Sequence, residues 1–114
     1  MTGPAAWIAA RRELLTERLA RVEGRLSGVR EARGDWIDEE HDPEGFALTF
    51  EWQQAEGARA TITDELRELE AAEARLAAGA FGMCDVCGQP IPAAQLELRP
   101  ARTTCVACAD TRRP

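Results

Sequence analysis

The sequence predicts a mainly α-helical fold: a long antiparallel coiled-coil hairpin followed by a small C-terminal module organised around four cysteines. Two long stretches carry apolar residues at alternating steps of four and three, and all four cysteines lie in two Cys-x-x-Cys pairs near the end of the chain. Only three Phe, three Trp and no Tyr are present. A thin, elongated fold with an added staple is therefore easier to stabilise than a compact core.

The first predicted helix covers residues 5–33, which are rich in Ala, Arg, Glu and Leu, all good helix formers. Gly24 and Gly28 weaken it, and local bending or the close approach of another helix are candidate reasons. Its large apolar residues follow the seam of a coiled coil. They are Ile8, Leu15, Leu19, Val22, Leu26 and Val29.

The second predicted helix covers residues 46–78. Gly57 weakens it in turn, and Gly79 is the expected C-terminal cap. The seam again advances by four and three residues. Its apolar members are Leu48, Trp52, Ala55, Ile62, Leu66, Leu69 and Leu76.

Folding the second stretch back on the first gives a consistent register, because the residue numbers of facing seam positions add up to nearly the same total throughout. In this register Arg12 faces Glu73, and Arg33 faces Trp52 for a cation–π contact. Half of the total falls at Asp42-Pro43, and proline disfavours helix at the residue before it. The hairpin is therefore expected to reverse there, with Trp7 packing at the opposite end.

The negative charge of the chain is concentrated at the predicted tip. Residues 35–44 contain six acidic residues and no arginine, and so account for the whole net charge of −6. The remainder is balanced and offers no cationic footprint for duplex nucleic acid, which argues against sequence-specific DNA binding. An acidic run is commonly just a solvated loop, but its place at the tip favours a binding role.

The sequence shows no signal peptide and no apolar run of membrane-spanning length. We therefore expect a cytoplasmic protein that makes no membrane contact, and we expect a monomer. In a reducing compartment, clustered cysteines favour a metal over disulfides.

The two cysteine pairs, Cys84/Cys87 and Cys105/Cys108, are separated by seventeen residues. This spacing is typical of a tetrahedral zinc site, with two disulfides or a redox dithiol as the alternatives. Gly88 is expected to supply a turn with positive φ after the first pair. Four thiolate ligands leave no position for water, so the sequence predicts one structural Zn²⁺ and no catalysis at the metal.

At these residues the chain resembles the DksA/TraR family of zinc-finger transcription regulators. The resemblance lies in the run from Phe81 to Gly88, in Arg99-Pro100-Ala101 and in the second cysteine pair. It implies an antiparallel hairpin over residues 1–79 with an acidic tip near 35–47, and a four-cysteine zinc finger over residues 80–114. It also implies that the tip enters the secondary channel of bacterial RNA polymerase and modulates initiation.

The family's tip motif is close to Asp-Pro-x-Asp-x-Ala. Residues 42–47 match its first Asp, its Pro and its Ala, while Gly45 stands at the second Asp. Arg99 matches a basic family position and is a possible partner contact. The residues that the resemblance places at the partner-binding tip are Asp42, Glu44, Ala47, Asp38 and Glu40.

Three other classes of function remain alternatives. A zinc-stapled coiled-coil adaptor for another protein fits the same fold, and only the chemistry of the tip separates it from a polymerase regulator. A DNA-binding zinc ribbon would rely on the few arginines near the C-terminus. An enzyme is disfavoured because His41 is the single histidine and lies far along the chain from the cysteines.

Overall fold

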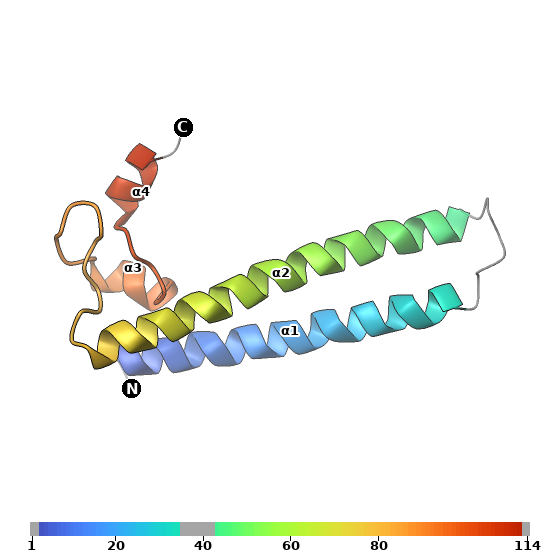
Figure 1. Cartoon of the computed structure of the whole chain (residues 1–114), viewed down its shortest axis with the longest axis horizontal. Helices are drawn as coiled ribbons and strands as arrows, with labels where there is room; N and C mark the ends of the chain where they lie inside the picture. Colours follow the sequence, from blue (N-terminus) through green and yellow to red (C-terminus); the bar gives the residue numbers. More distant parts are fainter. Residues whose placement is uncertain (1–2, 35–42, 113–114) are drawn as a thin grey trace. The chain divides into compact units, whose positions relative to one another are not determined.

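The computed structural model describes residues 3–34 and 43–112, with side chains at 3–32 and 47–111. In these ranges the chain forms four α-helices (Figure 1). Two are long, α1 (Pro4–Gly34) and α2 (Pro43–Ala77), and two are short, α3 (Ala93–Leu98) and α4 (Val106–Arg112). The mainly α-helical class is confirmed.

The chain divides into two compact units. The first, here called the zinc-finger unit, combines residues Met1–Leu14 with Glu65–Pro114; the second, here called the hairpin unit, is Leu15–Asp64. In each unit, segments of α1 and α2 lie side by side and run in opposite directions (Figure 1). This arrangement confirms the predicted antiparallel hairpin.

Helix α1 begins and ends within one residue of the prediction. Pro4 occupies its first position, where a missing N–H costs nothing and the fixed φ suits the helix. The first turn closes where the Trp7 N–H donates to the Gly3 carbonyl at 2.9 Å.

Helix α2 begins at Pro43, three residues before the predicted start. Proline is favoured at the first helical position, which agrees with a start at this residue. At the other end, Gly79 has φ +76°. The Gly79 N–H donates to the Leu76 carbonyl at 3.2 Å and the Ala80 N–H donates to the Arg75 carbonyl at 2.8 Å. These two bonds are those of a Schellman cap, as expected for Gly79.

The core of the hairpin unit is small. Val22, Leu26 and Ala55 are buried together. Trp52, Ala58 and Ile62 pack against them. All but Ala58 belong to the predicted seams, so the alternation of steps correctly identified the inner faces of α1 and α2.

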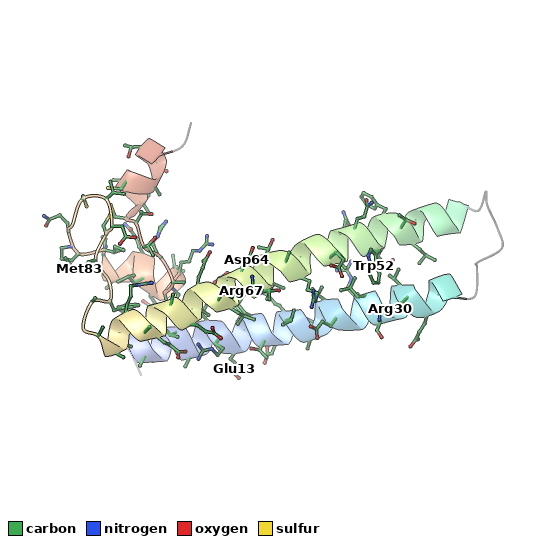
Figure 2. The ribbon with its side chains drawn as sticks, viewed as in Figure 1. Glu13, Arg30, Trp52, Asp64, Arg67 and Met83 are labelled. Atoms are coloured by element: carbon green, nitrogen blue, oxygen red, sulfur yellow. The ribbon has the colours of Figure 1, made fainter. Side chains whose placement is uncertain are left out.

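Two polar contacts flank this core. Arg30 makes a cation–π contact with Trp52, and its guanidinium carbon is 5.5 Å from the centre of the ring (Figure 2). The Arg33 side chain lies outside the described residues. Arg59 Nε is 3.8 Å from Glu23 Oε1, and both side chains are about half exposed.

In the zinc-finger unit the helices are joined by two ion pairs. Arg12 pairs with Glu73 as the register predicted. Arg11 forms a second pair with Glu65, a two-pronged contact in which Nε and Nη2 each donate to one carboxylate oxygen. Nη2 is 2.8 Å from Oε1, and Glu65 is buried with an exposed fraction of 7%.

The predicted reversal at Asp42-Pro43 falls mostly outside the described residues, since α1 ends at Gly34 and the next described residue is Pro43. The segment between the cysteine pairs includes regular structure. It contains α3, which starts directly after Pro92. No described helix has an apolar stretch sufficient to cross a bilayer.

Candidate metal centre

The first cysteine pair lies on a tight reversal of the chain between Gly82 and Ile91. The Ile91 N–H donates to the Gly82 carbonyl at 2.7 Å, and Met83, labelled in Figure 2, forms an antiparallel bridge with Pro90. Inside this frame the Cys84 N–H donates to the Gln89 carbonyl at 2.9 Å.

Glycine is required at two positions in this reversal. Gly82 has φ +86° and Gly88 has φ +72°, conformations that side chains with a Cβ rarely adopt. At Gly82 an added Cβ would also lie only 3.3 Å from Leu96 Cδ1. The turn with positive φ that the sequence predicted at Gly88 is present.

The second pair begins just before α4 and is held to the first. The Asp85 N–H donates to the Thr103 carbonyl at 2.8 Å. This bond joins the first cysteine pair to the segment that precedes Cys105. The Val106 N–H donates to Gln95 Oε1 at 3.1 Å, so the side chain of α3 satisfies an otherwise free donor in the second knuckle.

These contacts bring the four sulfur atoms within 4.8 Å of one another. A tetrahedral zinc ion about 2.3 Å from each sulfur places the sulfurs roughly 3.8 Å apart, so the cluster fits this ion. The cysteines are free thiols rather than disulfides, from the buried Cys84 to the exposed Cys87.

Hydrogen bonds make the cysteines electrostatically unequal. The pKa of the Cys84 thiol is lowered to about 6, chiefly by the backbone N–H of Cys87 and then by that of Cys105, which lies 3.4 Å from the sulfur. The pKa of Cys108 is raised to about 12, first by a hydrogen bond with the side chain of Cys105 and then by burial. Four adjacent thiolates therefore need a cation to coexist.

Comparison with known families settles the type of this module. Residues 79–113 match the family model described as the prokaryotic dksA/traR C4-type zinc finger. The chain carries a zinc finger of the DksA/TraR family. The predicted zinc cofactor is confirmed by this match together with the sulfur cluster, and in such a site the ion would be held by Cys84, Cys87, Cys105 and Cys108.

A solved structure of similar fold is that of the transcription factor DksA2 from Pseudomonas aeruginosa. It aligns with a TM-score of 0.54 and 23% sequence identity over 94% of this chain and 83% of that chain. Because the alignment covers 94% of this chain, the similarity in fold includes the helical hairpin as well as the finger. Comparison with curated protein sequences finds no significant match.

The DksA/TraR finger has an apolar core that includes a residue from α1. Cys84, Ile91 and Leu96 are buried together, and Trp7 packs against them as expected. The Trp7 indole Nε1 is buried without a hydrogen-bond partner among the described residues. The first turn of α1 therefore contributes Trp7 to the apolar core that contains Cys84, the first zinc ligand.

Arg99, predicted as a possible partner contact, is exposed and lines a surface pocket of about 340 Å³. Arg75 and Arg102 line the same pocket, and so does Glu68. The contact of Arg99 with a partner stays a prediction. The pocket combines three guanidinium groups from α2 and the finger, a clustering that their spacing in the sequence did not reveal.

The predicted tip residues are described only in part. Asp38, Glu40 and Asp42 lie outside the described residues, and for Glu44 the side chain does. Ala47 is exposed on α2. The role of these residues in binding a partner stays a prediction.

Proposed function

We propose that this protein is a transcription regulator that binds the core of bacterial RNA polymerase. The acidic end of its helical hairpin would enter the secondary channel and modulate initiation. The observation that carries the proposal is the combination, in one chain, of a DksA/TraR-type zinc finger with an antiparallel helical hairpin. The similarity in fold to a protein named as a transcription factor adds support.

The two ends of such a regulator have different tasks. The zinc finger is a structural module, because a full set of four thiolates leaves zinc no open position for substrate or water. We propose that the chain is no enzyme, and that it divides functionally into a hairpin of residues 1–79 and a finger of residues 80–114. We further propose that it acts as a cytoplasmic monomer without reading DNA sequence.

The charge distribution supports the choice of partner surface. The six acidic residues between 35 and 44 lie in and around the connection of α1 to α2. Carboxylates at this place suit a basic or metal-containing site on a protein better than a nucleic-acid backbone, which would repel them. Ala47, exposed beside this connection, allows a close approach.

The proposal is tested by in vitro transcription with purified RNA polymerase, with and without the zinc-loaded protein. We expect a change in initiation at sensitive promoters, and we expect it to disappear with Asp42→Asn while circular dichroism and zinc content stay unchanged. Binding of the Asp42→Asn variant as tight as that of the wild type would instead favour an adaptor that uses another surface.

A further inference from the structure

The outward face of α2 in the hairpin unit differs in composition from the rest of the exposed surface. Over residues 47–61 the exposed side chains facing away from α1 are all uncharged (the green part of α2 in Figure 1). We call this set the neutral face. It consists of Ala47, Phe50, Gln53, Gln54, Gly57, Ala60 and Thr61.

The face of α1 in the same unit provides the contrast. Of the twelve exposed residues among 15–32, seven are charged. Arg59 is also exposed on α2, but it is directed towards Glu23 of α1. A solvated coiled-coil surface normally carries charges like those of α1, so four turns without any are unexpected in a chain that is 30% charged.

Two members of the neutral face have no evident role within the chain. Phe50 is 59% exposed and is the largest exposed apolar side chain among the described residues of this unit. Gly57 lies in mid-helix, where glycine is unfavourable relative to alanine, and an added Cβ there would meet nothing within 4 Å. Packing among the described residues therefore explains neither Phe50 nor Gly57.

An interface explains both. Interface centres are depleted in charge and enriched in aromatic residues, and a helical glycine lets another backbone approach closely. Glu51 and Glu56 border the neutral face on its two sides, and Asp64 follows it. The complementary surface is uncharged along its centre and flanked by basic residues.

We propose that the neutral face is a docking surface for an α-helix of the partner protein, with a small-residue apolar stripe flanked by Lys or Arg. The inference rests on the proposed function, and it assigns to RNA polymerase a second contact beside the hairpin end. Phe50 is the apolar anchor of this contact, and Gly57 marks the closest approach of the two helices.

The test measures binding of the zinc-loaded, fluorescently labelled protein to purified RNA polymerase core. Gly57→Arg adds bulk and a charge that basic flanks repel, so we expect binding roughly tenfold weaker or worse. Gly24→Arg is the matched control, because Gly24 is also an exposed mid-helix glycine with nothing within 4 Å. It should change the dissociation constant by less than about twofold. Phe50→Ser should weaken binding as Gly57→Arg does.

The outcomes separate this inference from the proposed function. Absence of binding by the wild type would overturn the proposed function and the docking surface together. Binding by the wild type with equal affinities for Gly57→Arg and Gly24→Arg would overturn the docking surface alone. A wild-type dimer in analytical ultracentrifugation that Gly57→Arg converts to monomer would also overturn it, since the neutral face would then belong to a second copy.

Discussion

The zinc-finger unit and the hairpin unit use the same two helices but are stabilised by different contacts. In the zinc-finger unit, α1 and α2 are joined by the buried pair Arg11–Glu65, and Trp7 packs into a finger organised around four cysteines. In the hairpin unit the helices share a small apolar core, with an ion pair that is largely exposed.

The difference indicates which contacts fix the register of α1 against α2. Buried, directional contacts tolerate little error in position, because an unpaired buried charge or an incomplete metal site is costly. A seam of small and branched apolar residues is more permissive. We therefore expect the register of the whole hairpin to be set mainly in the zinc-finger unit, and we expect substitutions there to cost more.

The largest effect is expected from removing a zinc ligand. Cys84→Ser should abolish stoichiometric zinc and unfold the finger, because the free energy of zinc binding is also folding free energy. Zinc content by mass spectrometry and limited proteolysis measure both. The helical signal of the hairpin unit should largely persist. Full zinc content with an unchanged digestion pattern would contradict the structural role of the site.

Acid should act on the same unit. The lowered pKa of Cys84, about 6, means that its thiolate contributes stability fully present above its ordinary pKa near 9 and lost as the pH falls towards 6. Zinc must also displace protons from the other thiols, so its apparent affinity should fall by more than about tenfold per pH unit below pH 7. A competition titration between pH 8 and 5 measures this. A constant affinity over that range would refute it.

The two ion pairs give a direct comparison of the units. Arg11→Leu removes the two-pronged partner of the buried Glu65 carboxylate and should cost about 3 kcal/mol of unfolding free energy. The matched change Arg59→Leu breaks the exposed pair with Glu23 and should cost less than about 1 kcal/mol. Urea denaturation measures both. Equal losses would mean that burial does not distinguish the two pairs.

A similarly small effect is expected at the half-exposed pair Arg12–Glu73. Glu73→Arg brings like charges together and should destabilise the protein by about 1 kcal/mol or less. Adding Arg12→Glu restores opposite charges and should recover part of the loss, as measured by thermal melting of the zinc-loaded protein. Absence of any recovery would show that these two side chains do not interact in solution.

Much of the fold could be predicted from the sequence because helical seams and caps depend on local pattern. The steps of four and three identified Val22, Leu26 and Ala55 as core, and the register paired Arg12 with Glu73. Gly79 ends α2 by the expected cap. The cysteine spacing alone indicated which sulfurs would meet.

What the sequence did not reveal depends on contacts that leave no periodic signal. Arg11 and Glu65 each lie one position beside a seam residue, and their pairing follows from side-chain reach rather than register. The same reach allows Arg30 to contact Trp52, a contact that the register did not predict. Helix α3 has only six residues and lies among prolines, so it is too short to give a periodic pattern in the sequence.

The packing of Trp7 against the finger has a consequence for how the protein is made. The matched finger begins at residue 79, yet its core includes a side chain from the first turn of α1. A newly synthesised chain can close that core only after the finger has been made and Trp7 has packed against it. Stable zinc binding would then report that α1 and the finger have packed together. A finger expressed alone would expose the apolar surface that Trp7 covers and would lose its ion sooner.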